Sequence, residues 1–162
     1  MTSRLALKRS EFFPHLFASE TLNINRLSAT SFRFAMFLWE AIGRGATEDR
    51  AHWDGAQWQH YLADPRCEFY AAYCDGEPAG CVEIVVEQRL MRTAGGSARL
   101  KAFGLLPEFE GDDISSAILT RIAEKAFAKG ATELTLRKGD DLPDTTLLMF
   151  RQQGFRILST AN

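Results

Sequence analysis

The stretch from Ala102 to Gly130, AFGLLPEFEGDDISSAILTRIAEKAFAKG, constrains the fold of this chain more than any other part of it. Its first residues, Ala102 to Leu106, are apolar, and Pro107 ends that run because proline has no N–H to donate to a strand ladder. After the acidic segment 108–113, apolar side chains recur at the spacing of one buried helix face: Ile114, Ala117, Ile118, Ile122, Ala126 and Phe127. The stretch therefore predicts a strand, a turn and a helix, and free N–H groups at the start of such a helix can bind an anion.

Composition limits the class of protein. The chain has 162 residues, of which 46% are hydrophobic and 25% charged, as expected for one soluble globular domain. A net charge of −2 gives no support for nucleic-acid or membrane-surface partners, and no apolar run is long enough to span a bilayer. Cys67, Cys74 and Cys81 match neither a disulfide framework nor a metal site, so we expect free cysteines, no metal and a cytoplasmic location.

The first 21 residues are the hardest to assign. They contain Phe12, Phe13, Leu16 and Phe17 around a proline, and we expect an irregular arm or a short helix. This Phe-rich arm could pack on its own domain or on a second copy in a homodimer. Residues 22–158 are expected to form the core of a single domain that spans residues 1–162.

The rest of the chain alternates strands and helices. Expected strands span residues 22–27, 67–74, 78–86, 97–106, 133–137 and 154–158. Expected helices span 32–42, 54 or 55 to 63, 114–129 and 145–153. Asp75-Gly76 is a strong hairpin signal between two of the strands. The pattern predicts an α/β (α+β) fold, in which one mixed central sheet has helices on both faces.

At residues 105–136 and at FRQQGF, which starts at Phe150, the sequence resembles the GNAT superfamily of acyl-CoA N-acyltransferases. The hairpin DGEPAG followed by CVEI looks like that family's second and third strands. The segment EDRAHWDGAQWQHYLADP is similar to a poorly characterised bacterial GNAT subgroup. The resemblance covers Asn23 to Ile157.

This resemblance implies a co-substrate and its binding residues. Family members hold acetyl-CoA or another acyl-CoA between two splayed parallel strands, and they transfer the acyl group to a small-molecule or peptide amine. The pantetheine would pair with the backbone of the fourth strand, and the diphosphate would bind the loop before the helix. The positions concerned here are Phe103, Gly104, Leu105, Leu106, Glu110, Gly111, Asp112, Asp113, Ile114 and Ser115.

The diphosphate loop departs from the family pattern. Where relatives read Arg/Gln-x-x-Gly-x-Gly/Ala, this chain has Glu110, Asp113 and Ser115. The carboxylates of Glu110, Asp112 and Asp113 would repel a diphosphate, and Asp113 or Ser115 could cap the helix in its place. One like-charge pair at roughly 4 Å costs about 4 kcal/mol at an effective dielectric of 20, as an upper figure. We therefore expect a weakened CoA site.

The catalytic positions also differ from the family pattern. Phe150 matches the position of the usual Tyr acid and has no proton to give, and Arg99 stands where the subgroup often has a Glu. Glu83 matches a carboxylate of the subgroup and is the candidate base; its alternative is an outward-facing strand residue.

Further candidates are less specific. His52 and His60 are either bases or structural residues, and the Asp140-Asp141 pair is either an acceptor site or a polar turn. Trp39, Trp53 and Trp58 either line an acceptor pocket or pack in the core. Two functions remain: a GNAT-like N-acyltransferase with a weakened CoA site, or an inactive GNAT-fold protein that acts as a binding or regulatory module.

Overall fold

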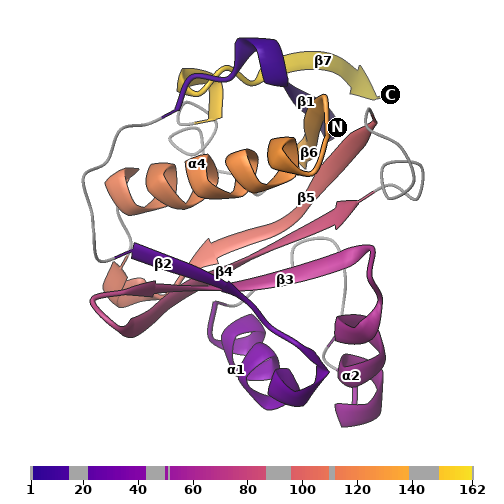
Figure 1. Cartoon of the computed structure of the whole chain (residues 1–162), viewed down its shortest axis with the longest axis vertical. Coiled ribbons are helices and arrows are strands. Elements are labelled where there is room, and N and C mark those ends of the chain that lie inside the picture. The colour runs from indigo at the N-terminus through magenta and orange to yellow at the C-terminus, as the bar shows by residue number, and fades with distance from the viewer. Residues whose placement is uncertain are drawn as a thin grey trace.

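One mixed sheet with helices on both faces forms the structure, a computed structural model that describes residues 2–14, 22–42, 50, 52–86, 96–109, 112–138 and 150–161 (Figure 1). The seven strands follow the order β2-β3-β4-β5-β6-β1-β7. Helix α4 covers one face of the sheet, and α1 and α2 cover the other (Figure 1). The predicted α/β fold with a mixed sheet is confirmed.

The elements have the following bounds. The strands are β1 Thr2–Lys8, β2 Leu22–Arg26, β3 Cys67–Cys74, β4 Glu77–Val86, β5 Ser97–Leu105, β6 Glu133–Lys138 and β7 Arg156–Ala161. The helices are α1 Phe32–Ile42, α2 Gly55–Ala63 and α4 Asp112–Ala128, with 3-10 turns at Arg9–Glu11, Ala29–Ser31 and Pro107–Phe109. None of the described helices is long and apolar enough to cross a membrane.

The β3–β4 hairpin forms where the sequence predicts it. Asp75 and Gly76 have φ angles of 54° and 80°, the left-handed pair that a two-residue type I′ turn needs. Asp tolerates this conformation better than most residues, and Gly adopts it without strain.

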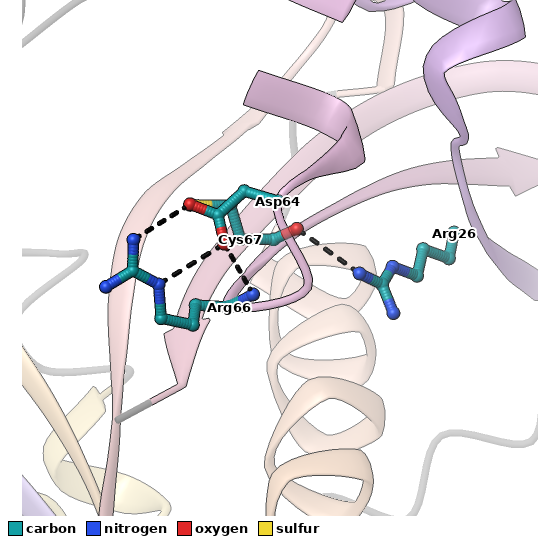
Figure 2. A network of polar contacts seen from close by, with 4 residues as sticks. All are labelled: Arg26, Asp64, Arg66 and Cys67. Atoms are coloured by element: carbon teal, nitrogen blue, oxygen red, sulfur yellow. Dashed lines mark hydrogen bonds and ion pairs between the residues drawn. The ribbon is translucent and has the colours of Figure 1, made fainter. Parts of the chain in front are cut away.

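Helix α2 is fixed at both ends by aspartates. At its start, the Asp54 carboxylate accepts from the Gln57 N–H at 2.8 Å while the Gln57 side chain accepts from the Asp54 N–H, which is a capping box. After its end, Asp64 accepts from the Arg66 backbone N–H at 2.9 Å and from the Arg66 guanidinium at 3.1 and 3.3 Å (Figure 2). Arg26 of β2 donates to the Cys67 carbonyl beside this turn (Figure 2). These contacts fix the direction in which the chain enters β3.

The sheet separates two apolar cores. On the α4 face, fully buried Ile118, Leu119 and Ile122 pack with side chains of β1, β4, β5 and β6. On the opposite face, Trp58 and Leu38 pack with β3 and β4. The helix faces follow the three-and-four spacing predicted from the sequence.

The N-terminal segment is not an arm. β1 lies inside the sheet, antiparallel to β6 on one side and to β7 on the other, and Leu5 and Leu7 are fully buried. The expectation of an irregular arm or short helix is therefore wrong for Thr2–Lys8. The alternation in RLALK is a strand signal, but the partners of this strand lie at the far end of the chain.

Candidate active site

The two parallel strands at the centre of the sheet separate along their length. β5 pairs with β6 only from Ser97–Glu133 to Leu100–Leu136. Beyond that point β5 continues to Leu105 against β4, while β6 follows β1 as far as Lys138. The residues from Lys101 to Leu105 therefore have one strand edge that β6 does not cover. The splay that the family resemblance implies is present.

A β-bulge lies where the two strands part. Across the β4–β5 pair, Glu83 faces Ala102 but Ile84 faces Leu100, so Lys101 is the extra residue. Bulges leave a residue outside the ladder and bend the strand. Leu100 before the bulge and Phe103 after it both pack on the α4-side core, so Lys101 lies on the α2 side. Its Nζ is 4.9 Å from the centre of the Tyr61 ring.

A buried polar cluster of Arg50, Tyr61 and Glu83 lies next to the bulge. Arg50 approaches both Glu83 carboxylate oxygens, with Nη2–Oε1 at 2.9 Å and Nη1–Oε2 at 3.1 Å. The Tyr61 hydroxyl donates to Glu83 Oε1 at 2.6 Å and accepts from Arg50 Nη2 at 3.4 Å. The Arg50 and Glu83 side chains are only 2% and 0% exposed. The arrangement neutralises a carboxylate that would otherwise be very costly to bury.

Aromatic rings surround the Arg50 guanidinium. Its central carbon lies 4.7 Å from the ring centre of Tyr61, 4.9 Å from Trp53, 5.4 Å from Trp58 and 5.8 Å from Trp39. Such rings attract a cation through their negative faces. Trp58 is buried, as expected for core packing, whereas Trp39 and Trp53 are half-buried. The tryptophans thus pack in the core and also hold a cation.

Burial raises the pKa of the Tyr61 hydroxyl above its usual value, and the Glu83 charge beside it acts in the same direction. Tyr61 therefore stays protonated and can donate to Glu83. Burial likewise raises the pKa of the Cys81 thiol, and its side chain is 4% exposed. Cys81 is therefore a buried free cysteine of low reactivity.

Glu83 lies in the right region but in an unexpected environment. The alternative of an outward-facing strand residue is wrong, because Glu83 is fully buried on the α2 side of β4. Hydrogen bonds from Arg50 and Tyr61 and an ion pair with Arg50 occupy its oxygens. This geometry suits charge compensation better than proton uptake. Sequence reasoning missed Arg50, which lies between the expected helices 32–42 and 55–63 and whose ion-pair partner Glu83 is 33 residues away in the chain.

Phe150, which the family resemblance places at the position of the usual tyrosine acid, is buried in the α4-side core. Its ring centre lies 6.4 Å from that of Phe103 and 5.2 Å from that of Phe155, with edge-to-face geometry. Only 2% of Phe150 is exposed. The Phe150 side chain is apolar and cannot supply a proton, and Arg99, which the resemblance implies stands in place of a glutamate, is exposed.

The expected co-substrate residues lie along β5 and the start of α4. Phe103, Gly104 and Leu105 are half-buried on β5, and the Leu106 N–H donates to the Ala79 carbonyl at 2.7 Å. Asp113 is exposed in the first turn of α4. Ile114 packs on the core and Ser115 is half-buried. Glu110, Gly111, Asp140, Asp141 and the side chain of Asp112 lie outside the described residues.

A hollow of about 460 Å³ opens beside the cluster, on the outer side of α2. Its lining includes Trp53, Asp54, Gln57, His60, Tyr61 and Asp64. His60 thus faces the hollow, while His52 is exposed nearby. A larger hollow of about 610 Å³, at Lys8, Arg9 and Thr132, lies among exposed side chains away from this site. Among the described residues, no group of His, Cys, Asp and Glu is placed to hold a metal.

Residues 33–155 match the family model described as Acetyltransferase (GNAT) family. A protein named IAA acetyltransferase from Azospirillum brasilense is 32% identical over 94 residues, which are 58% of this chain and 58% of that protein. The chain therefore spans little more than half of that relative.

Solved structures share the fold. A functionally unknown conserved protein from Staphylococcus epidermidis superposes with a TM-score of 0.67 at 20% identity, over 98% of this chain and 59% of its own. An aminoglycoside acetyltransferase from an uncultured soil metagenomic sample, in complex with sisomicin, gives a TM-score of 0.64 at 15% identity, over 82% and 87% of the two chains. At these identities the likeness is one of fold. The match across residues 33–155 shows that the chain belongs to the GNAT acetyltransferase family.

Proposed function

We propose that this chain transfers an acetyl or other acyl group from acyl-CoA to an amine. The observation that carries the proposal is the uncovered edge of β5 from Lys101 to Leu105, which begins where β5 leaves β6. An extended, amide-bearing ligand such as pantetheine can pair with such an edge as an added strand would. Family membership supports the same co-substrate.

The position of the reacting centre follows from the direction of β5. The diphosphate end of the ligand would lie near the start of α4, beyond the C-terminal end of β5. The thioester would then lie toward the point where the strands part, beside the bulge at Lys101. A bulge frees backbone groups from the ladder, and a backbone N–H there could polarise the thioester carbonyl. The Arg50–Glu83–Tyr61 cluster lies next to this point.

In this proposal Glu83 is a positioning residue. The amine nitrogen forms a bond to the acyl carbon, the carbon–sulfur bond breaks, and the thiolate takes up a proton that the amine has released to water. Glu83 holds Arg50 and Tyr61, which form one wall of the site. The variant Glu83→Gln tests whether Glu83 acts as a positioning residue or as a general base. Loss of a general base lowers the rate about 10²–10⁴-fold and removes its limb of the pH profile, whereas a positioning role leaves the shape of the profile unchanged.

We further propose that acyl-CoA binds more weakly here than in relatives with a glycine-rich loop. Support comes from Asp113, which is exposed in the first turn of α4, and from the neighbouring acidic residues of the sequence. Asp112→Asn with Asp113→Asn keeps side chains that can cap a helix and removes two charges. We expect tighter acetyl-CoA binding in this variant. Glu124→Gln, a change at an exposed position farther along α4, is the matched control. Weaker binding after the double change would refute the repulsion argument.

The proposed function is tested by two measurements on the intact chain. In a thermal-shift titration, acetyl-CoA at 100 times its dissociation constant should stabilise the fold by about 2.7 kcal/mol. For a domain of this size that corresponds to a rise in Tm of roughly 5–10 °C. A thiol-release assay with a panel of amines then reports transfer. No stabilisation at millimolar acetyl-CoA would refute the proposal.

The second candidate is a GNAT-fold binding or regulatory module without catalysis. The observation in its favour is the buried ring of Phe150, a residue that the resemblance places where relatives have a tyrosine acid. Binding of acetyl-CoA without thiol release for any amine of the panel would favour this candidate.

A further inference from the structure

The hollow on the outer side of α2 has two aromatic walls, Trp53 and Tyr61. Their ring centres are 5.3 Å apart, with their planes 58° from parallel. Both rings also contact the buried Arg50 guanidinium, and Trp53 packs edge-to-face on Trp58 at 5.1 Å. Tyr61 is held in addition by its hydrogen bond to Glu83. The walls are thus fixed before any ligand arrives, which lowers the entropic cost of binding.

The charged side chains that line this hollow are carboxylates. Asp54 and Asp64 contribute one each, Gln57 and His60 are the other polar lining residues, and no Lys or Arg among the described residues lines it. The Arg66 side chain donates hydrogen bonds to Asp64, and this lowers the pKa of that carboxyl below its usual value. Lys101 lies over the Tyr61 ring but is not part of the lining. Because the Arg66 guanidinium offsets much of the Asp64 charge, the hollow presents aromatic faces together with negative charge that Asp54 mainly carries.

We propose that this hollow binds an organic amine, in its ammonium form, that carries a flat hydrophobic group. The flat group packs on Trp53 and Tyr61, and the ammonium lies toward Asp54 and Asp64. A volume of about 460 Å³ is in the range of small-molecule sites. That this ligand is the acyl acceptor rests on the proposed function; that the hollow binds it does not.

The binding test needs no acyl-CoA. Three probes are titrated into the intact chain by calorimetry: 2-phenylethylamine, its carboxylate counterpart 3-phenylpropionate, and n-butylamine, which has the charge but no ring. We expect 2-phenylethylamine to bind at least tenfold more tightly than either of the others. Equal affinity for the ammonium and the carboxylate, or no heat from 2-phenylethylamine at millimolar concentration, would overturn the proposal.

The variant Asp54→Asn with Asp64→Asn tests the carboxylates. Asparagine can still cap α2 and form the turn at Arg66, so folding is retained. Two exposed ion pairs near the upper end of their usual strength correspond to about a tenfold loss of affinity for 2-phenylethylamine. Asp75→Asn, on the distant β3–β4 hairpin, is the control and should change nothing. Unchanged affinity in the double variant would overturn the proposal.

A separate transfer assay distinguishes the two levels of inference. If 2-phenylethylamine binds as described but is never acylated, the site stands and its role as acceptor site fails. If the amine is acylated at the same kcat/KM by the wild type and by the Asp54→Asn, Asp64→Asn variant, the proposed function stands. The acceptor then binds elsewhere, and the role of the hollow as acceptor site is wrong, whereas calorimetry alone decides whether the hollow binds the amine.

Discussion

The Arg50–Glu83 pair should dominate the stability of the α2 side of the sheet, and a double-mutant cycle measures this. Arg50→Met leaves a buried carboxylate without its counter-ion, and Glu83→Leu leaves a buried guanidinium without its own. With side chains 2% and 0% exposed, each change should lower the free energy of unfolding by about 3–5 kcal/mol. That is a large fraction of the roughly 5–15 kcal/mol that stabilises a typical domain.

The double variant should be far more stable than the sum of the single effects predicts. The double variant should still lose about 1–3 kcal/mol of unfolding free energy, because the Tyr61 hydroxyl then has no acceptor in the cluster. Adding Tyr61→Phe should recover most of it. The coupling energy between Arg50 and Glu83 should therefore exceed about 3 kcal/mol.

Urea unfolding followed by tryptophan fluorescence measures these values, since Trp39, Trp53 and Trp58 surround Arg50. The control is Arg66→Met, which breaks the pair with Asp64 that Figure 2 shows. The side chains of Arg66 and Asp64 are 53% and 26% exposed, so we expect the free energy of unfolding to fall by less than about 1 kcal/mol. Single losses below about 1 kcal/mol for the buried pair, or additive effects, would contradict the reasoning.

Three further predictions concern the rest of the domain. First, the pKa of Tyr61 is raised in the fold. Its contribution to the free energy of unfolding is therefore complete below pH 10 and is lost as pH rises toward the folded pKa. The free energy of unfolding of the wild type should thus fall by about 1.4 kcal/mol more per pH unit above 10 than that of Tyr61→Phe. Parallel pH profiles of unfolding free energy for the two proteins would refute this. Second, Gly104→Ala should lower the free energy of unfolding by about 1–3 kcal/mol, because a Cβ there would overlap Cγ2 of Ile42. An equal loss when Gly104→Ala is made in an Ile42→Ala variant would exclude that clash as the cause. Third, Leu5→Ala should lower the free energy of unfolding, measured in urea, by about 2–5 kcal/mol, as for a core position. A loss below about 0.5 kcal/mol would indicate that β1 is dispensable for the fold.

Local patterns in the sequence predicted most of the fold. Phe32–Ile42 and Cys67–Cys74 have the predicted bounds, and the turn at Asp75-Gly76 is where its residues require it. Periodicity and turn chemistry are local, so a single sequence reveals them. The position of β1 depends on partners more than a hundred residues away, and no local signal names them.

The site could be predicted only in part. Glu83 was found as a candidate, but its burial, its hydrogen bond from Tyr61 and its ion pair with Arg50 depend on how α2 packs on β4. Arg50 lies between helices, where charged residues are usually solvated, so nothing local marked it as buried. The diphosphate-binding role of Asp113 and its neighbours stays a prediction.

The place of β1 in the sheet has a consequence for how the domain is made. During translation β1 emerges before every other described element, whereas its neighbours β6 and β7 emerge after nearly everything else. Until then Leu5 and Leu7 have no sheet to enter. Pairings between distant segments form slowly, and unpaired apolar strands invite aggregation. A nascent chain that stalls before β6 would thus expose β1, and we expect the cell's chaperones to meet this protein at its N-terminal strand.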